Sequence, residues 1–280
     1  MNPLSLDANG LHFHALSWGE PAAPLVLLAH GFPDSPHSWA ELGSALAAAG
    51  YYAVAPFLRG YAPTQCPAAD TTLRNLGEDL NALGAALGRP TAHLIGHDWG
   101  AEAAYAAVGL EPTRWLSLTT IAIPHRATLR FTWSIAWGLR HVVALSLPGA
   151  EQRFAANDFA MIETFFRRWS PTWNYTTEDL APVKACFRQP GSVHAALGYY
   201  RAATVLTPDF MARPVTVPAL NIAGTDDPAV TLADYESTRR HYQAGLQLVG
   251  VPGGHFCHRE SPARVEEVVL AHLRAHPGGS

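Results

Sequence analysis

Short stretches rich in Val, Leu, Ile and Ala alternate along the chain with longer segments in which apolar residues recur at helical spacing. The apolar stretches are "PLVLLAHG" (24–31), "YYAVAPFLRG" (51–60), "TAHLIGHD" (91–98), "WLSLTTIAI" (115–123), "VPALNIAG" (217–224) and "LQLVGVPG" (246–253). The helical segments include "SPHSWAELGSALAAAG", "TTLRNLGEDLNALGAALG" and "WGAEAAYAAVGLEP". Strands that are apolar throughout and alternate with helices predict an α/β fold with a mostly parallel, doubly wound sheet that helices cover on both faces.

The alternation stops after residue 125 and resumes near residue 216. Between these points, "FAMIETFFRRW" and "SVHAALGYYRAATVL" have helical periodicity and a high aromatic content. We therefore predict a core formed by residues 1–125 and 216–280 and an inserted helical lid formed by residues 126–215. An insertion that follows one strand of an open sheet would overhang the carboxyl edge, where α/β folds bind ligands.

Composition and charge exclude several classes of function. A chain of 280 residues with 48% hydrophobic content can bury a large core. Its 19 basic and 23 acidic side chains form no run of one sign, so neither a nucleic-acid surface nor a polybasic membrane contact is expected. The three cysteines are far apart, which indicates a reduced compartment without a disulfide framework. No secretory signal pattern and no membrane-length apolar stretch occurs, so we expect a cytoplasmic protein, either monomer or homodimer.

The stretch "GHDWGAE" (96–102) places an ionisable residue, Asp98, between two glycines where a strand is predicted to become a helix. A strand, a Gly-x-nucleophile-x-Gly turn and a helix together form a nucleophile elbow, in which the central side chain is forced out at the top of the sheet. The amides and dipole at the start of the helix would keep Asp98 ionised. Because Asp is also a common N-cap residue, a purely structural role for Asp98 is the alternative.

Two further segments supply partners for Asp98. "HGFPDSPHSW" (30–39) is similar to the oxyanion-hole loop of α/β-hydrolases, and the backbone amides of Phe32 and Trp99 are the expected donors. Near the carboxyl terminus, "IAGTDDPAV" places Asp226 and Asp227 after one strand, and "VPGGHFCHRESP" places His255 after the next. Nucleophile, acid and histidine follow one another in the chain order that such a fold requires.

Taken together, the motifs resemble the epoxide hydrolase branch of the α/β-hydrolase fold over essentially the whole chain. The matching stretches, in order, are "HGFPDSPHSW", "LRGYAPT", "GHDWGAE", "AIPH", "LPGAE", "GYYRA", "AGTDDP" and "GHF". The resemblance implies a hydrolase that needs no cofactor and opens a small hydrophobic epoxide with water. It also implies that the acid stands directly before a proline, which favours Asp227 over Asp226, and that the base directly follows a glycine, which favours His255 over His258.

A carboxylate nucleophile suits an sp³ carbon electrophile, because it is already ionised at neutral pH and forms an ester. His255, oriented by Asp227, would then activate the water that hydrolyses the ester of Asp98. A metal bound by His255, Cys257 and His258 lacks further ligands at a usable spacing, so no metal site is expected.

The lid is expected to supply the acid that protonates the opening epoxide. Tyr200, which directly precedes Arg201, matches the ring-activating tyrosine of the resembling family, whereas Tyr199 is expected to pack elsewhere. Many members of that family have a second lid tyrosine shortly before a Leu-Pro-Gly. The corresponding segment "LRHVVALS" contains no tyrosine, and His141 stands closest to that position. We therefore hypothesise that His141 and Tyr200 both bind the epoxide oxygen.

Three other functions compete with epoxide hydrolysis. Haloalkane dehalogenases also use a Trp after the nucleophile to bind halide, but they usually take a second donor from an Asn, and Phe32 occupies that position here. Fluoroacetate dehalogenases follow the nucleophile with an Arg, where this chain has Trp99. A non-catalytic protein that binds a hydrophobic ligand is the third alternative, since a fold alone does not establish an activity.

Overall fold

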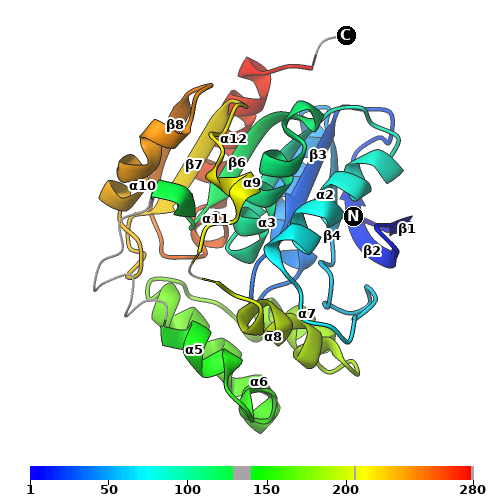
Figure 1. Cartoon of the computed structure of the whole chain (residues 1–280), viewed down its shortest axis with the longest axis vertical. Coiled ribbons are helices and arrows are strands. Elements are labelled where there is room, and N and C mark those ends of the chain that lie inside the picture. Colours follow the sequence, from blue (N-terminus) through cyan, green and yellow to red (C-terminus); the bar gives the residue numbers. More distant parts are fainter. Residues whose placement is uncertain (129–139, 205, 279–280) are drawn as a thin grey trace.

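Eight strands form a single sheet at the centre of the protein (Figure 1). The computed structural model describes residues 1–128, 140–204 and 206–278. The strands follow the order β1-β2-β4-β3-β5-β6-β7-β8, and those from β4 to β8 run parallel to one another. Their bounds are β1 Asn2–Ala8, β2 Leu11–Trp18, β3 Leu25–Ala29, β4 Tyr52–Pro56, β5 Ala92–His97, β6 Trp115–Ile121, β7 Ala219–Gly224 and β8 Leu246–Val251. The predicted α/β class with a mostly parallel sheet is confirmed.

The hairpin of β1 and β2 is absent from the sequence-based prediction. These strands pair antiparallel with each other, and β2 pairs antiparallel with β4, at one edge of the sheet. Half-buried and exposed residues alternate along most of β1, so this segment lacks the continuous apolar stretch used to find the central strands. The turn Asn9-Gly10, in which both residues have positive φ angles of 45° and 74°, is the local signal for such a hairpin.

Helices cover both faces of the sheet. On one face α1 (Ala40–Ala48) packs against α12 (Pro262–Ala275), and on the other α2 (Leu73–Ala86) packs against α3 (Trp99–Leu110). The side chains of α3 that are most buried are alanines, which let this helix approach the sheet closely. Two shorter helices, α10 (Leu232–Thr238) and α11 (Cys257–Glu260), follow β7 and β8.

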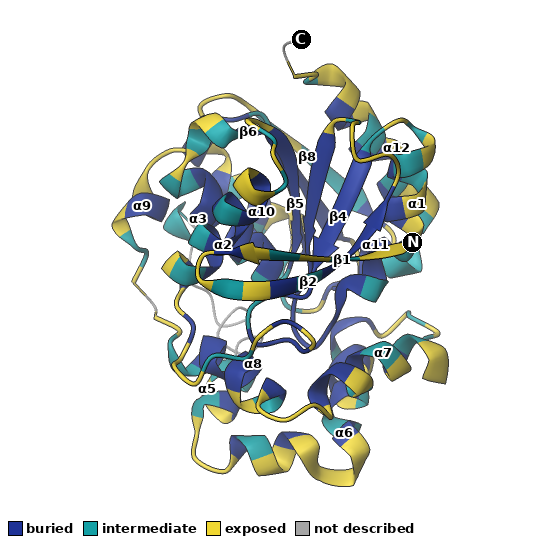
Figure 2. Ribbon diagram, turned by 90° about the vertical axis from the view of Figure 1, so that its right-hand side faces the viewer, coloured by how far each residue is buried: buried dark blue, intermediate teal, exposed yellow. Residues whose placement is uncertain are grey.

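The remaining helices lie between β6 and β7 in the sequence, and α5 to α8 gather beyond one end of the sheet (Figures 1 and 2). They are α5 Arg140–Ser146, α6 Ala150–Trp169, α7 Thr177–Phe187, α8 Ser192–Arg201 and α9 Asp209–Ala212. Helix α6 is interrupted by non-helical backbone at residues 156–159. The fold therefore contains the predicted helical lid, part of which, residues 129–139 and 205, lies outside the described residues.

Hydrogen bonds join the lid to loops at the carboxyl ends of the strands. The Tyr199 hydroxyl donates to the carbonyl oxygen of Arg59 at 2.6 Å, and the His255 amide donates to the carbonyl oxygen of Trp169 at 2.8 Å. These contacts place the lid above the loops that carry the candidate catalytic residues. No helix among the described residues is long and apolar enough to cross a membrane. The three cysteines, Cys66, Cys186 and Cys257, are free thiols.

Candidate active site

Asp98 lies in a strained turn between β5 and α3. Its φ and ψ angles are 51° and −121°, a conformation that costs a residue with a side chain about 1–3 kcal/mol. The turn is held by the Asp98 amide, which donates to Ile121 O at 3.3 Å, and by the Ala101 amide, which donates to Asp98 O at 2.9 Å. Although Asp98 occupies the N-cap position of α3, its side chain makes no capping hydrogen bond. The geometry is therefore that of a nucleophile elbow and not that of a helix cap.

The glycines on either side of Asp98 are required by close backbone approaches. A Cβ atom at Gly100 would overlap the carbonyl group of Ala29 in β3, and one at Gly96 would overlap the carbonyl oxygen of Gly100. Helix α3 could not start so close to β3 and β5 with larger residues at these positions. Both glycines therefore serve the tight turn that presents Asp98.

Three polar residues meet at this turn from separate parts of the chain. His255, between β8 and α11, has its Nε2 3.3 Å from Asp98 Oδ2 and its Nδ1 3.1 Å from Asp227 Oδ2. The backbone amide of Phe32 donates to the other oxygen of Asp98, Oδ1, at 2.8 Å. One carboxylate oxygen of Asp98 thus faces the histidine, and the other faces the Phe32 amide, one of the two donors predicted for an oxyanion hole. The second expected amide donor, that of Trp99, stays a prediction.

The two neighbouring acids Asp226 and Asp227 have different surroundings. Asp227 is buried and hydrogen-bonded to His255, and its second oxygen accepts from the Ala229 amide at 2.8 Å. Asp226 is exposed and accepts from the Gly253 amide at 3.1 Å. Asp226 therefore holds the loop before His255, and Asp227 is the acid that contacts the histidine.

Electrostatics sets the charges of the pair formed by Asp98 and His255. Burial acts to raise the pKa of Asp98, but the hydrogen bond and charge of His255 outweigh it, so the pKa is lowered. For His255, burial acts to lower the pKa, yet hydrogen bonds and charges from Asp227 and Asp98 raise it to about 10. At neutral pH, an ionised Asp98 therefore faces a protonated His255.

The oxyanion loop is positioned by a buried neutral histidine, His30, which the sequence analysis passed over. Its Nδ1–H donates to Gly31 O at 2.9 Å, and its Nε2 accepts from the Leu58 amide at 3.1 Å. Burial lowers the pKa of His30 to about 4, so the ring stays neutral and keeps both bonds. The His-Gly pair at the end of β3 is the sequence signal that marks this residue.

Tyr200 and His141 lie side by side in the lid. Their ring centroids are 5.8 Å apart, and the Tyr200 ring lies 5.0 Å from Phe32 and 5.3 Å from Trp99. The Tyr200 hydroxyl is buried, and no described residue accepts a hydrogen bond from it. Burial, and then the negative charge of Asp98, raise its pKa, and they outweigh the Trp99 side chain, which lowers it. The pKa therefore lies well above the usual value, and the phenol is protonated. Tyr199, whose hydroxyl bonds Arg59, points elsewhere.

The lid side of the site is lined by aromatic rings. Around Phe32, the rings of Phe154, Phe165 and Phe187 have centroids 5.3, 6.1 and 6.0 Å away. The Trp169 ring lies 5.4 Å from that of His255. An ionised carboxylate and a phenol therefore act in apolar surroundings, where electrostatic interactions are stronger than in water.

The chain matches known proteins over most of its length. The α/β-hydrolase fold family matches residues 24–262. An epoxide hydrolase from Caballeronia sordidicola is 30% identical over 318 residues, covering 96% of this chain and 92% of the relative. A fluoroacetate dehalogenase from Burkholderia is 27% identical, in a match that covers 84% of this chain and 82% of the relative.

Solved structures give the same result. The crystal structure of epoxide hydrolase A from Mycobacterium thermoresistibile superposes with a TM-score of 0.83 at 25% identity, covering 99% of both chains. The Mycobacterium structure shares the fold of this chain over its full length. The epoxide hydrolase from Caballeronia is identical to this chain at 30% of the aligned positions. The protein therefore belongs to the epoxide hydrolase branch of the α/β-hydrolase fold family.

Proposed function

We propose that the protein hydrolyses small hydrophobic epoxides to vicinal diols through an ester of Asp98. The observation that carries the proposal is the arrangement of Asp98 below Tyr200. A carboxylate is held by the Phe32 amide and a histidine, and the Tyr200 ring lies 5.0 Å from the Phe32 ring. No described residue accepts a hydrogen bond from the buried Tyr200 phenol. An epoxide needs both groups at once, because its ring opens with a nucleophile on carbon and a proton on oxygen.

In the first step, Oδ2 of Asp98 attacks an epoxide carbon and the C–O bond to that carbon breaks. The electron pair of this bond goes to the epoxide oxygen, which takes a proton from Tyr200, with His141 as the second hydrogen-bond donor. Oδ1 becomes the carbonyl oxygen of the ester and keeps its hydrogen bond from the Phe32 amide. The product of the step is a hydroxyalkyl ester of Asp98.

In the second step, formation of the ester changes the state of His255. The negative charge of Asp98 is one of the causes that raise the pKa of His255, and the ester has no such charge. The pKa of His255 therefore falls when the ester forms. His255 can then lose its proton, which restores the Tyr200 phenol. The neutral imidazole takes a proton from water, and the resulting hydroxide attacks Cγ of Asp98. The Phe32 amide stabilises the oxyanion on Oδ1. Collapse of this intermediate breaks the bond between Cγ and Oδ2, and the leaving alkoxide takes the proton of the new Asp98 carboxyl group. The diol is released, and Asp98 is again ionised beside a protonated His255.

The test that separates the candidate activities offers the full-length protein styrene oxide and a 1-bromoalkane. Diol from the epoxide with no bromide release supports the proposal. Bromide release without diol would identify a dehalogenase in which Trp99 binds the halide. Saturable binding of an epoxide without any turnover would support a non-catalytic binding protein.

The aromatic lining supports uncharged aryl or alkyl epoxides as the substrate class. Burying an unpaired carboxylate among Phe154, Phe165 and Phe187 would be costly. We therefore expect a higher kcat/KM on styrene oxide than on an epoxide that carries a carboxylate. The reverse order would exclude this substrate class.

Tyr200→Phe is expected to slow epoxide opening about 10²–10⁴-fold, the range for loss of a general acid. Single-turnover formation of the ester, measured by rapid quench, isolates this step. Tyr199→Phe is the matched control, because its hydroxyl bonds Arg59 in the loop after β4 and not the substrate. Equal rates of ester formation in Tyr200→Phe and the natural protein would remove Tyr200 from the mechanism.

His141→Ala is expected to slow the same step less than Tyr200→Phe does, by about tenfold, because one hydrogen bond to the epoxide oxygen remains. The measurement is again single-turnover ester formation with styrene oxide. An unchanged rate would show that Tyr200 acts without His141.

A further inference from the structure

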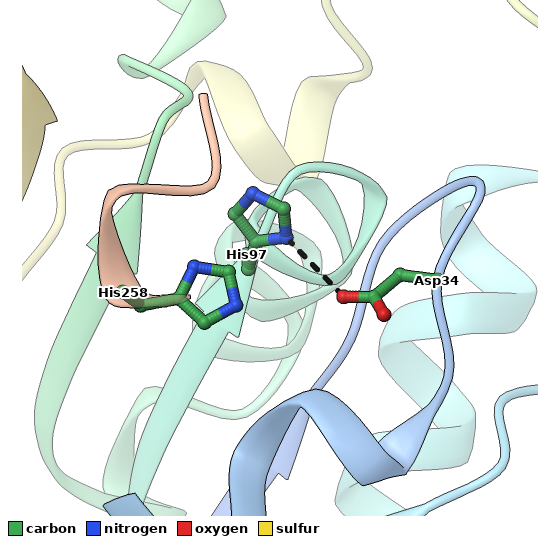
Figure 3. A group of neighbouring side chains, drawn as sticks. All are labelled: Asp34, His97 and His258. Carbon is green, nitrogen blue, oxygen red and sulfur yellow. Dashed lines mark ion pairs between the residues drawn. The ribbon is translucent and has the colours of Figure 1, made fainter. Parts of the chain in front are cut away.

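Figure 3 shows a second group of buried polar side chains, formed by Asp34, His97 and His258. It adjoins the candidate active site, because the His97 ring lies 5.0 Å from that of His255. Asp34 comes from the loop after β3, His97 is the last residue of β5, and His258 lies in α11. Their exposed fractions are 4%, 0% and 4%. Each offers one ligand atom, and the three atoms lie within 4.8 Å of one another. Residues more than 200 positions apart in the sequence thus meet in the interior.

Two lone pairs face each other in this group. The Nε2 of His97 lies 2.9 Å from the carbonyl oxygen of His255, so Nε2 must carry the hydrogen and donate it. Nδ1 of the same ring then has a bare lone pair, 4.0 Å from Oδ2 of Asp34. No described residue makes a hydrogen bond to either atom. A positively charged or hydrogen-donating group is needed between them.

His258 completes the group from the third side. Its ring centroid lies 4.4 Å from that of His97 and 5.0 Å from that of Trp39. Neither of its ring nitrogens has a hydrogen-bond partner among the described residues. Rotation about its side-chain bonds can therefore turn a nitrogen toward the other two ligand atoms without breaking an existing hydrogen bond.

The charges of the group favour a cation. The group consists of one carboxylate and two imidazole rings, so it offers negative charge and nitrogen lone pairs. Oδ1 of Asp34 accepts from the Ser35 amide at 2.7 Å. The one ion-pair neighbour of Oδ2 among the described residues is the His97 ring, at 4.0 Å.

The surrounding region adds to this excess of negative charge. Asp98 and Asp227 share one imidazolium, His255. Within the described part of the chain, the three carboxylates of Asp34, Asp98 and Asp227 therefore lie close to this one imidazolium. The nearby guanidinium of Arg259 is already paired with Asp179 at 2.5 Å. A divalent cation between Asp34 and His97 would neutralise the remaining charge.

We propose that Asp34, His97 and His258 form a binding site for a divalent transition-metal ion of the zinc class. Two imidazoles and one carboxylate are a common set of three protein ligands for such ions, with a water in the fourth position. A metal-binding histidine usually donates its other N–H to a carbonyl or carboxylate, as His97 does to His255 O.

Closing the site needs small movements. Bonds of 2.0–2.2 Å at tetrahedral angles place ligand atoms about 3.4 Å apart. The separation of 4.0 Å between His97 and Asp34 must therefore shrink by about 0.6 Å, and the others, which are at most 4.8 Å, by up to about 1.4 Å. Side-chain rotation of His258 and Asp34 can supply this change. The sequence analysis considered His258 only with its near neighbours His255 and Cys257, whereas the fold places it beside Asp34 and His97.

The test measures Zn²⁺ binding to the full-length protein after removal of metals with a chelator. Dialysis against Zn²⁺ followed by elemental analysis is expected to give about one bound ion per chain. His258→Gln and the nearly isosteric Asp34→Asn are each expected to weaken Zn²⁺ binding at least tenfold, as measured by titration calorimetry. His12→Gln is the matched control, because His12 is an exposed histidine that contacts a carboxylate, Asp7. This variant should bind Zn²⁺ like the natural protein.

Co²⁺ provides a second readout that does not depend on the variants. Substituted into the natural protein, it should give the visible absorption of a low-symmetry site with nitrogen ligands. Circular dichroism would establish that both variants are folded. No Zn²⁺ retained by the natural protein, or equal retention by the natural protein, His258→Gln and Asp34→Asn, would overturn the proposal, as would a Co²⁺ spectrum of the hydrated ion.

Discussion

Asp98→Ala is expected to lower diol formation from styrene oxide by at least about 10⁴-fold, because no other group can form the ester. The remaining side chains could only assist direct attack by water on the epoxide. Diol formed by the purified variant, measured by chromatography at saturating epoxide, gives the rate. Folding is checked by thermal unfolding, because alanine also has a Cβ atom and must adopt the same strained φ and ψ angles at residue 98.

Asp226→Ala is the matched control for this variant. Asp226 is exposed, bonds the loop before His255 and does not contact the catalytic histidine, so this variant should retain most of the activity. A single turnover of the natural protein in ¹⁸O-labelled water gives independent evidence. In the first turnover, the new oxygen of the diol should come from Asp98 and carry no label, whereas labelled diol would show direct attack by water.

His255→Gln is expected to stop the reaction after the first step and to trap the ester of Asp98. Steady-state turnover should fall about 10⁴-fold, since neither water activation nor proton transfer remains. Intact-protein mass spectrometry should show an increase equal to the mass of one epoxide on nearly every chain. The exposed His194→Gln serves as the control and should show no such adduct. Accumulation of the ester in His258→Gln but not in His255→Gln would assign the base to His258 instead.

The pH dependence of ester hydrolysis has a definite sign. In the free protein, Asp227 and Asp98 outweigh the effect of burial and raise the pKa of His255 to about 10. In the ester only Asp227 remains charged, so the pKa of His255 is lower. Hydrolysis needs the neutral imidazole, and its rate should therefore fall as the pH drops through that lower pKa. The fraction of the natural protein present as ester at steady state should increase toward acid pH.

Local patterns in the sequence were sufficient to find the central sheet and the turn at Asp98. The strands β3 to β7 are buried along almost their whole length, because helices cover both faces of the sheet, and such stretches can be recognised without any knowledge of their neighbours. Gly96 and Gly100 mark the tight turn because no other residue fits there. The edge hairpin of β1 and β2 was missed because its side chains alternate between core and solvent.

Tertiary structure decided which of two neighbouring residues faces the site. Asp226 and Asp227, and likewise Tyr199 and Tyr200, are adjacent in sequence and chemically identical. Their roles differ because the loop after β7 turns Asp227 toward His255, and α8 turns the Tyr199 hydroxyl toward Arg59. The spacing of residues along the chain does not show which of two neighbours faces the site. In the sequence, only the resemblance to a family favoured one residue of each pair.

The sequence by itself therefore determined the α/β sheet and the presentation of Asp98, because both follow from local spacing, backbone sterics and continuous burial. Only the tertiary structure brought together Asp34, His97 and His258, whose positions lie far apart in the chain. Such a cluster depends on how the loop after β3, the end of β5 and α11 pack around one point. No periodicity in the sequence predicts that these three residues lie close together, because each of them also fits its own segment as an ordinary loop, strand-end or helix residue.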